Sequence, residues 1–384
     1  VGIAKVVLKK GKTQLFKDGN PMVYSGAVDR IIGRPPPITG DVVLVSDGAE
    51  KTIGWGLYNS VSMFCVRLMQ LEDETTRDPS CALNMAKLLE TRIEAAVVLR
   101  EQLGFPSAKT NVYRLVNSEG DRLSGLIVDI FGDEAVIASS AAWVEKYKQQ
   151  IKGCIARINN INRIAWKPSV DILKEEGLDL SDIEDADLSK SHEISTNRGY
   201  VSSISNGKKV LDICCYTGGF ALNAAAGGAS SVTGVDSSSP ALAIAKKNIT
   251  LNKFDHSKIT FTKQDATDFL KNAISRGDLW DLVILDPPKL APSRKALQNA
   301  SGMYRNLNSL AMRVTRRGGL LMTCSCSGAM AQSGGMFLRI LQSAALRAGR
   351  KITVIRRSGA SCDHTIDPAY PEGEYLSNVL LRVL

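Results

Sequence analysis

Short apolar runs separated by turn-forming residues fill the first seventy positions of the chain. Asp41–Val45, Ile53–Tyr58 and Met63–Leu68 are rich in Val, Ile and aromatic residues, and Ser46-Asp47-Gly48 stands between the first two. Branched and aromatic side chains favour strands, whereas Asp, Ser and Gly favour turns. The pattern predicts a small β-barrel over residues 1–72.

Residues 73–190 combine the helical and the strand pattern. The stretch from 84 to 103 carries apolar residues at helical spacing without an internal proline or glycine, and Val144–Ile158 predicts a second helix. Three apolar runs predict strands, namely Val112–Val116, Leu126–Val128 and Ala135–Ala138. We therefore expect a separate α+β domain here.

From Lys208 onward, predicted strands and helices alternate regularly. The predicted strands are Val210–Cys214, Ser231–Asp236, Ile259–Thr262, Asp281–Asp286 and Leu320–Cys324. The predicted helices are Phe220–Ala226, Pro240–Leu251 with Ser239 as its N-cap, Ala266–Asn272 and Met303–Val314. Such units predict an α/β domain over residues 191–384, with a mainly parallel sheet covered by helices on both faces. Ligands of these sheets bind beyond the carboxyl ends of the strands.

Length, composition and charge agree with this three-part division. A chain of 384 residues exceeds what one hydrophobic core usually spans, and 44% apolar with 23% charged residues excludes a disordered chain. The net charge of +9 is spread unevenly, with +3 on residues 1–72, −5 on residues 73–190 and +11 on residues 191–384. This distribution favours a polyanion such as RNA as the partner of the two end domains.

The cysteines and histidines indicate in which kind of compartment the protein resides and whether it has a metal site. Eight scattered cysteines favour reduced thiols inside a cell, and three histidines without a Cys-x-x-Cys pair argue against a metal site. The uncharged run Ile213–Val235 holds Asn and many Gly, Ser and Thr residues, so we expect no membrane helix.

The compartment and the oligomeric state stay open at this stage. Because the sequence begins at Val1 rather than Met, we expect residues upstream of it. The compartment is the cytoplasm or, if a transit peptide preceded Val1, a chloroplast or mitochondrion. A homodimer is one of the oligomeric states that the sequence leaves open.

The junction after the first strand of the α/β domain has the features of a nucleoside site. It runs from Asp212 to Phe220 and contains the pair Gly218-Gly219, which lets the backbone approach a ligand closely. Asp236, at the end of the next strand, is placed to accept both hydroxyls of a ribose. Because Gly-x-Gly-x-x-Gly is lacking, a cofactor without pyrophosphate, such as S-adenosylmethionine, fits better than a dinucleotide. A plain tight turn followed by a solvated acid is the alternative.

Two further strand ends carry reactive groups. Asp286 precedes Pro287-Pro288-Lys289, and its carboxylate can hydrogen-bond the amino group and the protonated ring nitrogen of a cytosine. Methylation of cytosine at carbon 5 needs a thiolate that adds to carbon 6, after which a base removes the carbon-5 proton and the thiolate leaves. Cys326, after the fifth strand, has the position for this thiolate. Cys324, still within the strand, is expected to be a buried packing residue.

Together these motifs resemble the RlmI-type ribosomal RNA methyltransferases. In that family a PUA domain and a small α+β domain precede a Rossmann-like, S-adenosylmethionine-dependent domain. The resemblance extends over nearly the whole chain and implies methylation of a cytosine at carbon 5 in 23S-type rRNA. The residues that carry it are Asp212 to Phe220, Asp236, Asp286-Pro287-Pro288-Lys289, Ser325-Cys326-Ser327, Asp363-His364, Pro371-Glu372-Gly373, Tyr113 to Asn117 and Gly125 to Asp129.

The resemblance also implies roles for individual residues. Asp286 would hold the cytosine, with Pro287, Pro288 and Lys289 beside the substrate, and Cys326 would be the nucleophile. The residues implied for S-adenosylmethionine are Asp212, Tyr216, Thr217, Gly218, Gly219, Phe220, Asp236, Ser237, Asp265, Ala266 and Asp286. Within that set, Tyr216 to Phe220 would contact the methionine part, Asp236 the ribose and Asp265 the adenine side.

The chain departs from the family pattern at three points. A Gly-Gln-Lys-Thr-Gly-Phe … Asp-Gln-Arg segment before the first binding strand is reduced here to Asn197-Arg198, either by deletion or because residues are absent from this sequence. Thr365 stands where the family has Pro after Asp-His. Ser377 stands where the family has Lys after Tyr-Leu.

Two alternative functions remain open. Asp-Pro-Pro motifs also serve methyl transfer to an exocyclic amine or a guanine ring nitrogen, but an aromatic residue then follows, where this chain has Lys289. The other alternative is a non-catalytic RNA-binding ribosome assembly factor, which the shortened Lys-Thr-Gly segment supports. Calorimetry with S-adenosylmethionine separates the two classes, because an assembly factor with a decayed site would not bind the cofactor.

Overall fold

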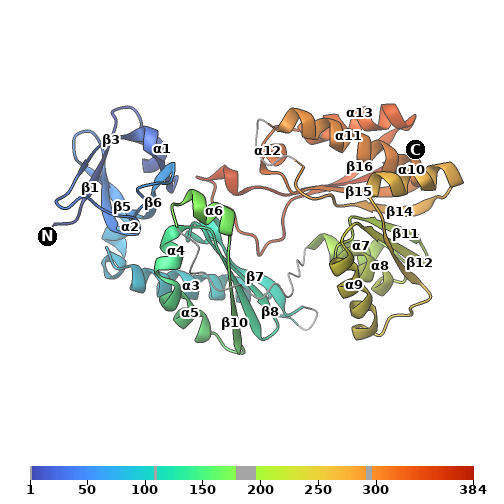
Figure 1. Cartoon of the computed structure of the whole chain (residues 1–384), viewed down its shortest axis with the longest axis horizontal. Coiled ribbons are helices and arrows are strands. Elements are labelled where there is room, and N and C mark those ends of the chain that lie inside the picture. The colour runs from blue at the N-terminus through green and yellow to red at the C-terminus, as the bar shows by residue number, and fades with distance from the viewer. Residues whose placement is uncertain (1, 108–109, 179–195, 291–295) are drawn as a thin grey trace. The chain divides into compact units, whose positions relative to one another are not determined.

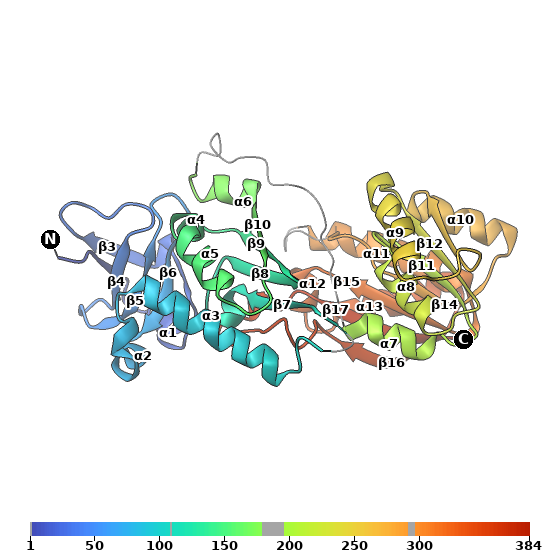
Figure 2. The same ribbon diagram turned by 90° about the horizontal axis from the view of Figure 1, so that it is seen from below.

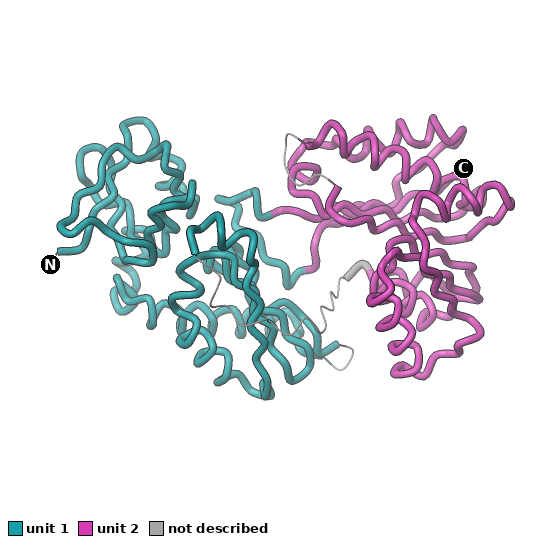
Figure 3. The backbone as a smooth tube through the Cα atoms, in the orientation of Figure 1, with its two compact units in different colours: residues 1–190, 362–373 teal, residues 191–361, 374–384 magenta. Residues whose placement is uncertain are grey.

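The chain forms two compact units (Figures 1 and 3). The structure is a computed structural model and describes residues 2–107, 110–178, 196–290 and 296–384. Unit 1 comprises residues 1–190 with 362–373, and unit 2 comprises residues 191–361 with 374–384. The domain boundaries expected at residues 72 and 190 stay predictions, and the second lies outside the described residues.

The N-terminal part of unit 1 is a six-stranded sheet in the order β2-β6-β5-β4-β1-β3. Its elements are β1 (Lys5–Leu8), α1 (Gln14–Lys17), β2 (Met22–Tyr24), β3 (Val28–Ile32), β4 (Val42–Ser46), β5 (Thr52–Tyr58) and β6 (Phe64–Leu71). Side chains such as Val6, Phe16 and Val45 form a core that solvent does not reach. The three strands expected from the sequence correspond to β4, β5 and β6, with shifted ends.

The second part of unit 1 is a four-stranded sheet in the order β10-β9-β8-β7. Its strands are β7 (Val112–Asn117), β8 (Leu126–Phe131), β9 (Glu134–Ser139) and β10 (Arg163–Pro168). Helices α3 (Met85–Gln102) and α5 (Lys148–Ala156) lie side by side in both ribbon views (Figures 1 and 2). The shorter helices are α2 (Glu72–Arg77), α4 (Ala142–Lys146) and α6 (Val170–Glu175).

The helix predicted over Val144–Ile158 is wrong in its extent. The chain instead forms α4 and α5, which are separated at Tyr147. Tyr147 interrupts the helix because its backbone angles, φ −102° and ψ 19°, are not those of an α-helix.

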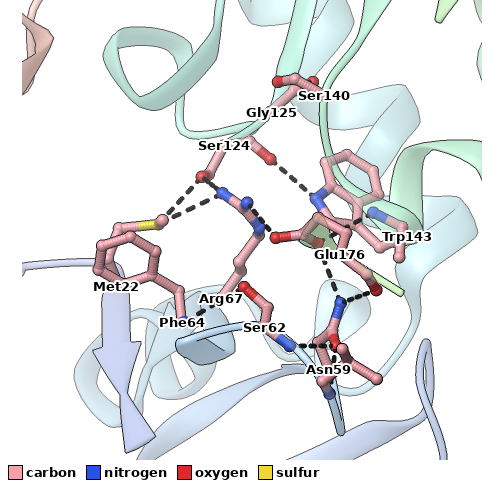
Figure 4. Close-up of polar contacts among 12 residues, drawn as sticks. Met22, Asn59, Ser62, Phe64, Arg67, Ser124, Gly125, Ser140, Trp143 and Glu176 are labelled. Carbon is pink, nitrogen blue, oxygen red and sulfur yellow. Dashed lines mark hydrogen bonds and ion pairs between the residues drawn. The ribbon is translucent and has the colours of Figure 1, made fainter. Parts of the chain in front are cut away.

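A buried polar network joins the two parts of unit 1 (Figure 4). Arg67 of β6 donates to Glu176, which follows α6, at 3.0 Å and to the Ser124 hydroxyl at 2.6 Å. Asn59 donates to the second carboxylate oxygen of Glu176 at 3.0 Å. The Trp143 indole donates to the Ser124 carbonyl at 2.8 Å. Each buried charge therefore has a partner from the other part, which ties the two sheets into one unit.

Unit 2 is a seven-stranded sheet in the order β13-β12-β11-β14-β15-β17-β16, in which, among the described residues, only β17 runs in the direction opposite to the other strands. The strands are β11 (Lys209–Ile213), β12 (Ser231–Asp236), β13 (Ile259–Lys263), β14 (Trp280–Leu285), β15 (Thr315–Ser325), β16 (Ile352–Ser358) and β17 (Ser377–Val383). The order of the strands reverses between β11 and β14, so this is the point at which parallel α/β sheets open a binding crevice.

Helices cover both faces of this sheet (Figure 1), which confirms the predicted α/β fold class. One face packs on α7 (Thr196–Ile204), α8 (Gly219–Ala226) and α9 (Ser239–Leu251). The other packs on α10 (Ala266–Arg276), α11 (Leu297–Val314) and α13 (Met336–Ala348), and the short α12 spans Gly328–Ala331.

Three local predictions in unit 2 are corrected. The N-cap of α9 is Ser238 rather than Ser239, because the Ser238 hydroxyl accepts the Ala241 N–H at 3.3 Å. Pro240 fits the first turn, whose N–H groups lack partners within the helix. Strands β11 and β14 end at Ile213 and Leu285, so Cys214 and Asp286 lie in the loops that follow.

Candidate active site

The predicted site residues of unit 2 gather at one edge of its sheet, where five parallel strands end. Asp212 lies in β11, Asp236 ends β12, and Asp265 follows β13. Asp286 and Cys326 follow β14 and β15. Because β11 and β14 are neighbours at the reversal of strand order, these groups border the expected binding crevice.

The loop after β11 has an unusual backbone. Cys214, Tyr216 and Gly218 all have positive φ, at 63°, 50° and 83°. Residues with a side chain rarely adopt this conformation, and such strain is typical of ligand-binding loops. At Gly218 a Cβ atom would lie 2.8 Å from the Phe261 ring, so packing as well as φ requires glycine there.

Asp236 holds this loop in place. Its Oδ2 accepts the Tyr216 N–H and its Oδ1 accepts the Ser238 N–H, each at 2.8 Å. A carboxylate oxygen can accept more than one hydrogen bond, so these contacts fix the group and leave capacity for a ligand hydroxyl. The predicted ribose acid is therefore positioned before any ligand binds.

Asp212 is completely buried. Its Oδ2 accepts the Ala221 N–H of α8 at 2.9 Å, while its Oδ1 has no hydrogen-bond partner among the described residues. Burial, together with the charge of Asp286, raises the pKa of Asp212 to about 8. A buried acceptor without a partner is unfavourable. The site therefore fits a polar or cationic group of a cofactor.

Four of the predicted acidic residues affect the pKa of the Cys214 thiol. Burial is the main cause that raises the pKa of Cys214 to about 12, and nearby carboxylates raise it further. These carboxylates, in decreasing order of effect, are Asp236, Asp286, Asp212 and Asp265. The structure thus brings together acids that lie far apart in the sequence, and it keeps the Cys214 thiol protonated.

The two candidate catalytic loops meet at Cys326 and Pro287. The Cys326 sulfur lies 3.9 Å from the Pro287 carbonyl oxygen, and Cys326 is half-buried. The Asp286 N–H donates to the Ile213 carbonyl at 3.2 Å, which anchors the Asp-Pro-Pro segment to β11. Pro288 and Lys289 are exposed, and both are thus accessible to a substrate.

Cys324 is buried, as predicted. Its sulfur accepts the Asn378 side-chain N–H at 2.9 Å. Burial is the main cause that raises the pKa of this thiol, and the charge of Asp286 raises it further. Cys324 therefore packs inside the sheet, as expected for a buried structural thiol.

The remaining predicted cofactor residues follow β12 and β13. Ser237 comes directly after β12, and Asp265 and Ala266 stand between β13 and α10. Asp265 is exposed and caps α10, since its Oδ1 accepts the N–H groups of Thr267 at 2.8 Å and Asp268 at 3.1 Å. Ser237 is exposed in the turn after Asp236. The capping role gives Asp265 a structural function beside its predicted contact with a ligand.

Sequence reasoning missed several residues that shape this edge. Arg198 of α7 lies with its guanidinium 5.8 Å from the Phe220 ring centroid, and a Cβ atom on Gly219 would lie 2.6 Å from that guanidinium. Asn248 of α9 donates to the Thr217 carbonyl at 3.2 Å, and Tyr304 reaches Ser325. Only Arg198 had a sequence signal, as part of the shortened family segment.

The Asp363-His364 motif packs within unit 1. Asp363 Oδ2 accepts the Arg114 N–H at 2.9 Å, and His364 Nδ1 lies 3.0 Å from Asp363 Oδ1. Across the described ranges, no helix has the length and apolar character needed to cross a membrane, and no three His, Cys, Asp or Glu side chains are grouped to hold a metal ion.

Two protein families match different parts of this chain, and curated relatives match nearly all of it. Residues 171–369 match the S-adenosylmethionine-dependent methyltransferase family, and residues 6–71 match a PUA-like domain. The chain is 31% identical to ribosomal RNA large subunit methyltransferase I of Alteromonas mediterranea over 404 residues, which covers 99% of each chain. It is also 31% identical over 409 residues to the protein of that name from Escherichia coli strain SMS-3-5, again with 99% of each chain covered.

Solved structures support the fold. A proposed S-adenosylmethionine-dependent methyltransferase from Streptococcus mutans superimposes with a TM-score of 0.78 at 17% identity, covering 99% of this chain and 100% of that chain. A methyltransferase complexed with SAH gives the same TM-score, identity and coverage. At this level of identity the likeness shows the fold alone.

Proposed function

The chain belongs to the family of ribosomal RNA large subunit methyltransferase I, and on this basis we propose that it methylates carbon 5 of a cytosine in large-subunit rRNA. The observation that carries this proposal is the Cys326 sulfur 3.9 Å from the Pro287 carbonyl, beside Asp286. Carbon-5 methylation needs a thiol beside the group that holds the base. Transfer to an exocyclic amine needs no thiol.

We assign the cofactor to the edge formed by β11, β12 and β13. S-adenosylmethionine supplies an activated methyl group on its sulfonium. The Asp212 Oδ1, which has no partner among the described residues, fits a polar group of the methionine part. The strained loop around Gly218 allows close approach, and Asp236 is fixed to accept the ribose hydroxyls.

The proposed reaction uses this chain's residues in a fixed order. The target base leaves the RNA stack and enters the crevice, where Asp286 hydrogen-bonds its amino group and protonated ring nitrogen. The Cys326 thiolate adds to carbon 6, and the electron pair moves to carbon 5, which takes the methyl group. A base then removes the proton from carbon 5, the double bond re-forms, and the thiolate leaves.

We assign RNA binding to the positively charged parts of the chain. The residues from 191 to 384 carry a net charge of +11 and those from 1 to 72 carry +3. Lysine and arginine contacts to phosphates supply sequence-independent affinity. The PUA-like part would add recognition of RNA shape.

Replacement of Cys326 tests the chemistry. Because the variant Cys326→Ala keeps the crevice but removes the nucleophile, we expect methyl transfer to unmodified 23S-type rRNA to fall at least ~10³-fold. Calorimetry should show unchanged S-adenosylmethionine affinity. The matched control is Cys362→Ala, at an exposed cysteine of unit 1, which should retain activity. Undiminished transfer by Cys326→Ala would rule out the proposed thiolate.

A further inference from the structure

Tyr304 of α11 is a buried residue whose hydroxyl touches the end of β15. The side chain has no solvent exposure, and its hydroxyl lies 2.9 Å from the Ser325 hydroxyl. The Ser325 oxygen also receives the Ser327 N–H at 3.4 Å. The hydrogen bonds therefore run from Tyr304 to the residues on either side of Cys326.

The same hydroxyl also faces the loop after β14. The pKa of Tyr304 is raised mainly by burial, and the charges of Cys326 and Asp286 raise it further. Hydrogen bonds from Ser325 and from the backbone of Leu290 lower it. Leu290 follows Lys289, so one phenol group lies within reach of both loops that carry the proposed catalytic residues.

The aromatic ring is held independently of the hydroxyl. The Tyr304 ring packs edge-on against Phe337 of α13, with 5.7 Å between centroids and an interplanar angle of 78°. Both residues belong to the apolar core between the sheet and α10, α11 and α13. Removal of the hydroxyl alone should therefore leave the packing of α11 intact, which makes its role separable from that of the ring.

We propose that Tyr304 is a positioning residue that fixes the Cys326 loop at the distance from the Asp286 loop required for attack on carbon 6. The inference rests on the proposed function, because it assigns a partner to that same thiol. Nucleophilic attack is sensitive to placement, and an error near 1 Å can cost about 10²-fold in rate. The Ser325 hydrogen bond ties the Cys326 loop to α11, and Leu290 of the other loop packs against the same apolar cluster as Tyr304, so the arrangement restricts such displacement.

The test compares Tyr304→Phe with the wild-type chain on 23S-type rRNA transcribed with 5-fluorocytidine. Fluorine at carbon 5 blocks proton removal, so the adduct between Cys326 and carbon 6 accumulates and its rate of formation can be measured. We expect adduct formation to slow by about tenfold or more in the variant. S-adenosylmethionine affinity should not change, whereas the pH profile of Cys326 alkylation by iodoacetamide should shift.

Two further variants isolate the hydrogen bond. Ser325→Ala removes the Tyr304 hydrogen bond together with the Ser327 one, so the double variant should be no slower than Ser325→Ala alone. Tyr113→Phe makes the same change at a buried tyrosine of unit 1 and should behave as wild type.

Each outcome has a defined meaning. Wild-type adduct rates and an unshifted alkylation profile in Tyr304→Phe would overturn the positioning role while the function of Cys326 stands. A parallel loss of cofactor affinity would show a merely structural role and would overturn it too. If the wild-type chain forms no adduct and Cys326→Ala still methylates RNA, the proposed function fails and the inference fails with it.

Discussion

At the scale of single residues, Asp212 connects the fold to the cofactor site. It sits inside β11, yet one of its oxygens is committed to the first turn of α8 and the other has no hydrogen-bond partner in the described parts of the chain. Burial, reinforced by Asp286, raises its pKa to about 8. Burial therefore favours the neutral form of this carboxyl.

This environment predicts a pH dependence of cofactor binding. S-adenosylmethionine carries a permanent positive charge on its sulfonium, so it should bind more tightly as pH rises toward about 8, where Asp212 ionises in the free protein, and the gain should level off above that pH. Calorimetry between pH 6 and roughly 9 measures this. Asp212→Asn should bind more weakly and without that rise. A wild-type affinity that is flat with pH would contradict the assignment.

The raised pKa of Asp212 also determines how this residue changes the folding stability with pH. The unfolded chain releases the Asp212 proton near the ordinary pKa of an aspartate, whereas the folded chain retains it up to about 8. The contribution of this group to stability is therefore complete below the ordinary pKa and is lost as pH rises through the folded value. In Asp212→Asn this part of the pH dependence should disappear.

At the scale of elements, the segment 362–373 depends most on distant contacts. The Thr365 carbonyl accepts the Asn117 side-chain N–H at 2.8 Å, and the Thr365 hydroxyl donates to Asp121 at 2.9 Å. Arg100, almost fully buried, forms an ion pair with Asp121. The segment 362–373 thus lies against the loop after β7, with little space between these two segments of the chain.

Substitution of Gly120 tests the close contact between the loop after β7 and the segment 362–373. A Cβ atom there would lie 2.0 Å from the Thr365 carbonyl oxygen, so Gly120→Ala should reduce the free energy of unfolding by about 2–4 kcal/mol. Hydrogen exchange should increase within 362–373. Gly153→Ala in α5, where nothing lies within 4 Å, is the matched control and should be neutral or slightly stabilising. Equal stability of both variants would argue against the tight contact.

The elements that the sequence predicted are those with strong local patterns. The run Val210–Cys214 is mostly apolar because a central parallel strand is buried on both faces, and the structure places β11 there, with β12 over Ser231–Asp236. The carboxyl ends of these strands then located Asp236 and its neighbours at one edge.

The features that the sequence did not predict depend on contacts between residues far apart in the sequence. Strand β16 is mostly exposed and contains Arg356 and Arg357, so it has no buried run and forms only because β17 pairs with it. The docking of Asp363 on Arg114 joins residues 249 apart. Tyr304 lies inside a helix with no motif, and only the end of β15 gives it a role.

At the scale of the whole molecule, the buried network of Figure 4 makes the two sheets of unit 1 one structure. Arg67 and Glu176 have side chains that are 10% and 6% exposed, so removing one leaves the other charge buried. This differs from the many surface pairs of the chain, which water screens.

Arg67→Ala should therefore lower the free energy of unfolding of unit 1 by about 3–5 kcal/mol. Chemical denaturation of the full chain measures this, with S-adenosylmethionine binding as a report on unit 2, which should not change. Arg163→Ala, which removes an exposed partner of Asp133, should cost less than about 1 kcal/mol. Similar losses for the two variants would show that the network is not what stabilises unit 1.

The methylated nucleoside that the enzyme forms identifies its chemistry. The most direct measurement is mass spectrometry of nucleosides from unmodified 23S-type rRNA that has been incubated with the purified chain and S-adenosylmethionine. We expect 5-methylcytidine as the new nucleoside, and we expect it to be absent when Cys326→Ala is used. A methylated exocyclic amine of cytosine or a methylated guanine, formed equally by both proteins, would contradict this expectation.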